Sequence, residues 1–174
     1  MLTDADVSLY NVRRLPIIAT RATGFAECQG CGSCCKGYPG LYVPEDFGED
    51  IERMAKAIRD GVAQVDRWDF AEDDTLGEVY FLRAPTRKSQ GRVIDFTWGG
   101  ACALLRADGC SLQYEARPRN CRGLVPAKTD GERDCREDTL AGERIEKRDY
   151  AATWEPFSGQ VEALARRISR EVGQ

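Results

Sequence analysis

The sequence predicts a small α+β domain in which short strands and peripheral helices surround a group of cysteines. Short runs that alternate apolar with polar residues, as strands do, stand beside longer runs in which apolar residues have helical spacing. The chain also holds eight cysteines and no histidine in 174 residues. Four of the cysteines fall within eight residues, and the other four are scattered downstream. This distribution predicts loops that are organised around sulfur.

The length predicts one domain. A chain of 174 residues is long enough for one sizeable core, and a second domain of average size would not fit comfortably beside it. Hydrophobic residues make up 42% and charged residues 31%, which is typical of a folded chain rather than a disordered one. We therefore expect a single domain over residues 1–174, with residues 25–135 as its cysteine-cluster core.

The first half of the chain predicts helices around one short strand. Apolar residues in 4–14 predict a first helix that Pro16 ends. Residues 41–43 predict a short strand. An acidic turn at 44–46 then opens a helix, and Gly61 ends it. One face of this helix carries Ile51, Met54, Ala55 and Ile58. Residues 62–68 predict a further short turn of helix, and 69–75 an acidic loop.

The second half predicts strands, a hairpin and a last helix. Residues 78–83 and 92–97 read as strands that pair across the basic run 83–92, which we expect to be a solvated loop. Residues 101–105 and 110–112 flank Asp108-Gly109, a dipeptide typical of tight hairpin turns. We expect turn or short helix over 114–121 and loop over 123–130. Ser158 is predicted to cap a helix with an apolar stripe of Val161, Leu164, Ala165, Ile168 and Val172.

Charge and hydropathy exclude several classes of partner. The net charge is −4 and the pI is about 5.1, so there is no overall positive field to attract nucleic acid or anionic lipid. No window approaches the roughly 18 apolar residues of a membrane helix, and the apolar run 15–19 is too short for a signal-peptide core. We therefore expect a cytoplasmic protein without nucleic-acid or membrane partners. In that reducing compartment, metal explains eight cysteines better than disulfides do.

The first cysteine group has the spacing of a metal loop. Cys28, Cys31 and Cys34 follow the C-x2-C-x2-C pattern with which ferredoxin loops hold three corners of an iron–sulfur cube. Cys35 stands directly beside Cys34, and neighbouring side chains diverge. These two residues are therefore expected to serve different metal atoms, unless one of them is a spare thiol.

The later cysteines complete a second set of four. Each of them alone would be expected to be a buried, inert cysteine, but as a set they complement the first motif. Closing long loops costs chain entropy that grows only logarithmically with length, so metal bonds can join remote segments. The full set of candidate ligands is Cys28, Cys31, Cys34, Cys35, Cys102, Cys110, Cys121 and Cys135. All-thiolate sites suit iron–sulfur clusters and zinc alike, and the motif favours the cluster; reactive thiols without metal are the third possibility.

The two cysteine motifs together resemble a known family. CQGCGSCC at 28–35 and GCSLQYEARPRNCR at 109–122 are similar to the YkgJ-like cysteine-cluster family, whose CxxCxxCC domain is named for suspected zinc or iron chelation. The resemblance implies ligand roles for the first seven cysteines of the set, and Cys135 lies beyond its motifs. Tyr114 stands one residue further from Cys110 than is usual, and residues 124–126 replace an aromatic-proline pair.

An enzyme is the alternative that the resemblance leaves open. Relatives of the family include flagellin lysine N-methylases, which implies methyl transfer to protein lysine. The chain has no glycine-rich loop after a predicted strand, and without histidine a general base would be a carboxylate, lysine, tyrosine or cysteine. Three arginines, Arg117, Arg119 and Arg122, surround Cys121, where they either offset thiolate charge or lie exposed in a turn.

Overall fold

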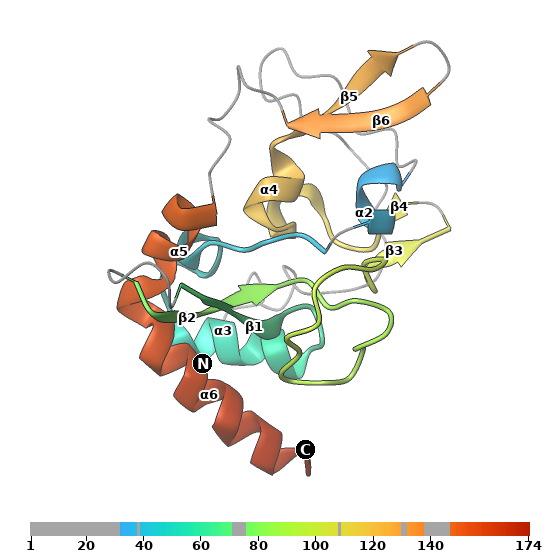
Figure 1. The fold of residues 1–174 in the computed structure, drawn as a ribbon. Coiled ribbons are helices and arrows are strands. Elements are labelled where there is room, and N and C mark those ends of the chain that lie inside the picture. Colours follow the sequence, from blue (N-terminus) through green and yellow to red (C-terminus); the bar gives the residue numbers. More distant parts are fainter. Residues whose placement is uncertain (1–31, 38, 71–75, 108, 130–131, 138–146) are drawn as a thin grey trace.

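The structure is a computed structural model that describes residues 32–37, 39–70, 76–107, 109–129, 132–137 and 147–174. It mixes helices with short antiparallel strands, which confirms the predicted α+β class (Figure 1). The predicted helix at 4–14, Cys28, Cys31 and the loop residues 71–75 lie outside the described residues. No helix of the described chain is long and apolar enough to cross a membrane.

A small sheet forms the centre of the molecule. Strand β1 (Gln64–Asp69) pairs antiparallel with β2 (Glu78–Arg83), and Val65 lies opposite Leu82. Leu41 adds an antiparallel bridge to the outer side of β2, and Ile94 adds a parallel bridge to the outer side of β1. The predicted strand at 78–83 is confirmed. The partner predicted for it is wrong, because β2 pairs with β1, and the segment 92–97, which was predicted to be a strand, joins the sheet only through the isolated bridge of Ile94 to Val65.

The helical turn predicted at 62–68 is also wrong, because these residues enter β1. Gln64, Val65 and Asp66 are all buried, so this strand is covered on both faces. A strand of this kind lacks the apolar and polar alternation by which strands are recognised in a sequence. Its two buried polar side chains are hydrogen-bonded to Arg83.

The helix predicted from residue 44 is divided in two. A 3-10 turn, η1 (Pro44–Phe47), comes first, and α3 (Ile51–Arg59) follows. Gly48 and Glu49 have φ of 63° and 58°, which breaks the helical path between them. Asp50 caps α3, because its Oδ1 accepts a hydrogen bond from the Glu52 amide at 2.8 Å. The predicted end at Gly61 is confirmed, with φ of 69°.

Two helices at the C-terminal end pack against the sheet. They are α5 (Lys147–Trp154) and α6 (Ser158–Glu171), which the 3-10 turn η3 (Glu155–Phe157) joins. The stripe predicted for α6 is buried at Val161, Leu164, Ala165 and Ile168, whereas Val172 is 54% exposed. Ser158 does not cap α6. Its hydroxyl accepts a hydrogen bond from the Tyr80 amide of β2 at 2.9 Å, so it joins the helix to the sheet.

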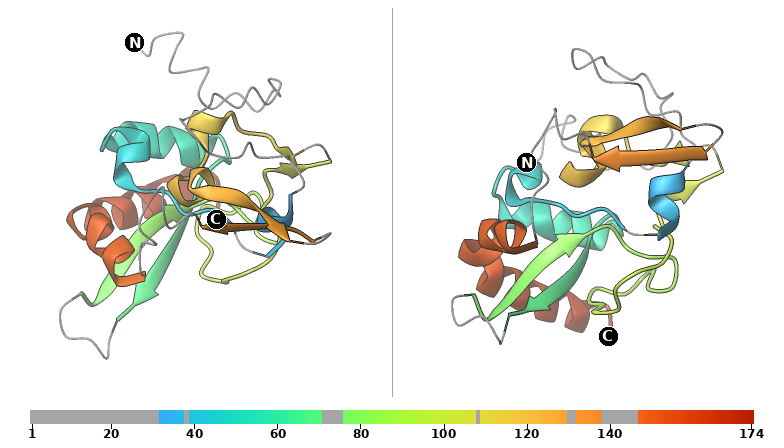
Figure 2. Two further views of the ribbon diagram at one scale, coloured as in Figure 1. Left: turned by 90° about the horizontal axis from the view of Figure 1, so that it is seen from above. Right: turned by 45° about the horizontal axis from the view of Figure 1, so that its top comes forward.

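The remaining elements are short and gather at the opposite side of the sheet (Figures 1 and 2). They are α2 (Ser33–Gly37), β3 (Leu105–Arg106), β4 (Gly109–Cys110), η2 (Tyr114–Ala116), α4 (Arg119–Arg122), β5 (Leu124–Thr129) and β6 (Glu132–Glu137). The predicted hairpin is confirmed in shorter form as β3 and β4, and the short helices predicted over 114–121 are confirmed as η2 and α4. The loop predicted at 123–130 is wrong, because β5 pairs with β6; Pro126, which usually marks a loop, lies within β5 opposite Cys135.

The prediction that residues 83–92 form a solvated loop is wrong at Arg83, which is the last residue of β2. Its side chain is fully buried and forms ion pairs with Asp66 at 2.5 Å and Asp95 at 2.8 Å. Burial alone would raise the pKa of Asp95, but hydrogen bonds from Thr97 and Arg83 lower it to about 2. Lys88, in contrast, is exposed as predicted. The arginine is therefore part of the core and closes a buried network between β1, β2 and segment 93–95.

Candidate metal centre

The first cysteine motif ends in helix α2, which is hydrogen-bonded to a segment remote in sequence. The Cys35 carbonyl accepts a hydrogen bond from the Cys102 amide at 2.8 Å, and the Gly37 carbonyl accepts one from the Gly100 amide at 3.0 Å. Two of the candidate ligands are thereby fixed side by side through their backbones. Cys34 lies in α2 as well, but its side chain is outside the described part of the structure.

The hairpin of β3 and β4 holds the next two cysteines. Cys110 is paired with Leu105, whose amide donates to the Cys102 carbonyl at 3.2 Å. The prediction that Cys102 and Cys110 belong to one hairpin region is confirmed. Gly32 fits closely against this hairpin: its φ is +72°, and a β-carbon there would lie 2.7 Å from Leu105 Cδ1. A larger residue would push the first motif away from the hairpin.

Helix α4 places Cys121 against the backbone at Gly40, in the segment before η1. A β-carbon at Gly40 would lie 2.3 Å from the Cys121 Sγ and 2.8 Å from Pro118 Cγ. No side chain fits there, so the glycine permits the thiol to approach the main chain. The Leu41 amide next to it donates to the Asn120 side-chain oxygen at 2.8 Å. These contacts fix the start of α4 and Cys121 against Gly40 and Leu41.

Asp46 holds the two ends of α4. Its carboxylate accepts hydrogen bonds from the Arg119 amide at 3.0 Å and the Val43 amide at 3.1 Å, and it forms an ion pair with Arg122. The Asp46 side chain is only 4% exposed. Since Cys121 lies between Arg119 and Arg122 in the helix, this carboxylate positions the thiol through its neighbours. The sequence pattern placed Asp46 only at a helix start, and no local signal connected it with α4.

The arginines around Cys121 have different surroundings. Arg122 is bound to Asp46, while Arg119 is exposed. Arg117 is buried, its Nε donates to the Leu112 carbonyl at 3.3 Å, and its guanidinium lies 5.9 Å from the centre of the Tyr114 ring. The prediction of arginines exposed in a turn therefore holds for Arg119 alone. The other two stabilise the loop that carries the second motif.

Tyr42 is buried in the same hydrophobic core cluster as Cys102. Burial raises the pKa of Tyr42 well above its ordinary value, and the negative charges of Cys121, Cys102 and Cys110 raise it further. The Tyr42 hydroxyl is satisfied by donating to the Val62 carbonyl at 3.1 Å. It joins the cysteine region to the start of β1.

Strand β6 brings the last cysteine of the chain to the same side. Cys135 is in β6, and β6 packs against α2, which carries Cys34 and Cys35. Figure 1 shows the hairpin of β5 and β6 beside this helix. The side chain of Cys135 is outside the described part, so its role stays a prediction.

The described thiols cover half of the predicted ligand set. Cys102 is buried, and Cys35, Cys110 and Cys121 are half-buried. Among the side chains that the structure describes, no three cysteines or carboxylates are grouped closely enough to hold a metal ion. The other four predicted ligands lie beyond these side chains. What the described residues provide is a set of soft sulfur donors at one end of the core, which fits zinc or iron and not magnesium or calcium.

The comparison with protein families decides what this cysteine region is. Residues 27–146 match the CxxCxxCC family, described as "Putative zinc- or iron-chelating domain". The chain belongs to this family. The match contains all eight cysteines and confirms the resemblance that the two motifs indicated. Comparison with curated proteins and with solved structures finds no match.

Membership in the CxxCxxCC family also gives context to residues that sequence reasoning missed. Gly40, Tyr42 and Asp46 all lie inside the matched range, between the two cysteine motifs. Gly40 and Asp46 contact the second motif across many residues of sequence. A glycine directly before a short strand is a common feature of a chain, and its close contact with a thiol becomes visible only in the folded structure.

Proposed function

We propose that this protein binds metal through its cysteine cluster, as an iron–sulfur cluster or, alternatively, as zinc. The observation that carries the proposal is that remote cysteines lie together: the backbones of Cys35 and Cys102 are hydrogen-bonded, and Cys110 pairs with Leu105, whose amide donates to the Cys102 carbonyl. Family membership in a zinc- or iron-chelating domain supports the same conclusion.

The proposed ligands are the eight cysteines named from the sequence. Cys35, Cys102, Cys110 and Cys121 stand at one end of the core, and α2 and β6 bring the backbones of Cys34 and Cys135 to that end. A bound iron–sulfur cluster would supply electron transfer, whereas zinc held by four thiolates would stabilise the fold. The protein itself supplies the positioning, through Gly40, Asp46 and the backbone pairing at Cys102.

The experiment is metal analysis of protein that is purified without oxygen. An iron–sulfur cluster gives a brown protein with broad absorbance near about 400 nm and iron matched by acid-labile sulfide. A colourless protein with stoichiometric zinc supports the alternative. Absence of both metals from freshly purified protein, together with failure to take up either on reconstitution, contradicts the proposal.

Variants then test which thiols bind the metal. Cys102→Ser and Cys121→Ser should each lower metal content, since serine is a poor ligand for soft metals. Ser111→Ala is the matched control: Ser111 is buried beside Cys110 and its hydroxyl has no hydrogen bond among the described residues, so its loss removes no thiol. Full metal content in both cysteine variants would exclude these two residues as ligands.

The enzymatic alternative, methyl transfer to protein lysine, stays a prediction from the resemblance. No described residue adds support to it. Its test is a rise in melting temperature with S-adenosylmethionine, because a ligand stabilises the folded state that it binds.

A further inference from the structure

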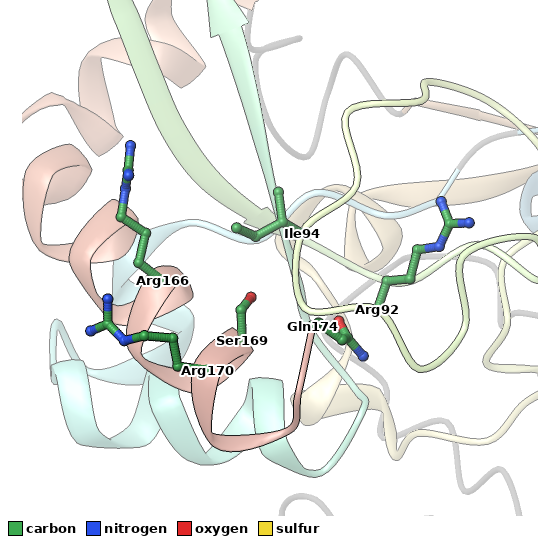
Figure 3. A pocket seen from close by; sticks show the side chains of 6 residues that line it. All are labelled: Arg92, Ile94, Arg166, Ser169, Arg170 and Gln174. Carbon is green, nitrogen blue, oxygen red and sulfur yellow. The ribbon is translucent and has the colours of Figure 1, made fainter.

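A groove on the far side of the molecule from the cysteines has a composition that the metal-binding function does not explain. It lies between the C-terminal half of α6 and the edge of the sheet at residues 92–94, and its volume is about 500 Å³ (Figure 3). Its lining residues are Arg92, Ile94, Arg166, Ser169, Arg170 and Gln174.

The groove is positively charged on a protein whose net charge is negative. Arg92 and Arg170 form no ion pair with any described residue, while Arg166 is paired with Glu162 at 2.6 Å. Figure 3 shows Arg166 and Arg170 on the α6 side and Arg92 across from them, with their guanidinium groups spread apart. A single small anion would contact one of these groups at a time. A ligand with several separated carboxylates would contact more than one of these guanidinium groups at once.

An apolar strip runs along the same edge of the sheet. Ile94 is half-buried in the groove, and Phe96, two residues further along the chain, is 47% exposed. Residues two apart in an extended segment face the same side. The Phe96 ring contacts Tyr80 at a centroid distance of 6.4 Å and lies under the Arg67 guanidinium at 4.7 Å. The groove thus offers apolar surface between positive charges.

The backbone of this edge is open to a further strand. Val65 donates to the Val93 carbonyl at 2.9 Å and accepts from the Asp95 amide at 3.0 Å. In this parallel pairing, the N–H and C=O of Ile94 point away from β1. No described residue is hydrogen-bonded to either group. Gln174 closes one end of the groove, where its side-chain oxygen accepts from the Val93 amide at 2.9 Å.

We propose that this groove binds a short extended segment of a partner protein that carries acidic and apolar residues on one face, at every second position. The carboxylates would pair with Arg92 and Arg170, the apolar side chains would cover Ile94 and Phe96, and one residue of the segment would exchange two backbone hydrogen bonds with Ile94. This is strand addition to a sheet edge, in which the backbone supplies affinity and side chains supply specificity. The inference is independent of metal binding.

The experiment uses the full chain as purified and a fluorescent eight-residue peptide, Glu-Thr-Val-Thr-Val-Thr-Glu-Thr, which places its glutamates and valines on one face of an extended strand. Binding is measured by fluorescence anisotropy. Arg92→Gln and Arg170→Gln should each weaken binding about two- to fivefold, as expected for one partly exposed ion pair. Lys88→Gln is the control: it removes the same charge from an exposed loop position outside the groove and should leave affinity unchanged. Absence of binding, or equal loss in all three variants, overturns the proposal.

Two further measurements separate this ligand from others. A peptide with the same charge, in which prolines replace the valines, cannot donate backbone hydrogen bonds at those positions and should bind at least about tenfold more weakly. Equal affinity for both peptides would show that charge alone acts and would overturn strand addition. Self-association of the wild-type chain that Arg170→Gln abolishes would assign the groove to a second copy and likewise overturn the proposal.

Discussion

The half of the molecule around β1 and β2 and the half around the cysteines are built in different ways. The first has strands of six residues, and a helix of 14 residues that buries an apolar stripe. The second also has two strands of six residues, β5 and β6, but its other elements include strands of two residues in β3 and β4 and a helix of four residues in α4. Elements that short are not stable by themselves in water. Burial holds the first half, and we predict that side-chain hydrogen bonds such as those of Asp46, together with thiol ligands, hold the second.

Removal of metal is expected to give the largest difference in stability between the two halves. Thiolate-bound zinc contributes apparent binding free energies of about 10 to 16 kcal/mol in small domains, so its loss should release the weaker half first. Hydrogen exchange after chelation should show lost protection in α4 and the hairpin of β3 and β4, with protection retained in β1, β2 and α6. Equal loss in both halves would show that the metal supports the whole fold, and no loss would show that it supports neither.

The substitution Arg83→Met should destabilise the half of the molecule around β1 and β2. The change leaves Asp66 and Asp95 buried without their cation, and breaking a buried pair costs about 3 to 5 kcal/mol. Urea unfolding measures the loss in free energy of unfolding. Arg87→Gln is the matched control, because Arg87 is exposed in the following loop and should change stability by less than about 1 kcal/mol. A loss below that limit in Arg83→Met would mean that the network is not important for stability.

Gly40→Ala tests the contact between the halves. The added β-carbon would collide with the Cys121 Sγ and Pro118, and we expect a loss of about 1 to 3 kcal/mol together with lower metal content. Gly37→Ala is the control, because nothing lies within 4 Å of a β-carbon there. Thermal unfolding and metal analysis of the two variants, measured side by side, check the prediction. Identical metal content would place Cys121 outside the ligand set.

Acid should lower the free energy of unfolding through the network around Arg83, by less than the substitution Arg83→Met does. The pKa of Asp95 is about 2 in the folded protein and about 4 in the unfolded chain, so its contribution is present above pH about 4 and is lost as the pH falls toward 2. The upper limit is about 2 kcal/mol, because burial raises the pKa of Asp66 and acts in the opposite direction. Urea unfolding between pH 5 and 2, with cysteine ligands controlled by prior chelation, measures the slope. Asp95→Asn should flatten it.

The sequence predicted those parts of the fold in which local pattern and environment agree. Helix α6, strand β2 and the hairpin near Asp108-Gly109 follow from periodicity and turn chemistry. Strand β1 was missed because Gln64 and Asp66 are polar and yet buried, which only the pairing with Arg83 makes possible. Strand β5 was missed because proline and glycine in 123–130 indicate a loop when they are considered without β6.

The sequence predicted the chemical type of the candidate site, but it did not predict the residues that position its cysteines. Cysteine spacing pointed to metal, and the family match agrees with it. Two residues position Cys121 from more than 70 positions away in the sequence: Gly40 lies against its sulfur, and Asp46 binds its helix neighbours Arg119 and Arg122. Such contacts are consequences of how the chain returns on itself, and nothing near Gly40 or Asp46 in the sequence indicates them.

The bond between Trp154 and Tyr42 gives this protein a built-in optical probe. The Trp154 indole is fully buried, and its Nε1 donates to the Tyr42 carbonyl at 2.9 Å. The Leu41 amide, next to Tyr42, donates to the Asn120 side-chain oxygen beside Cys121, so a shift of α4 would reach the surroundings of the indole. The difference in tryptophan emission between the wild-type chain and Trp154→Phe should therefore follow any movement of α4 when metal is added, without any added dye.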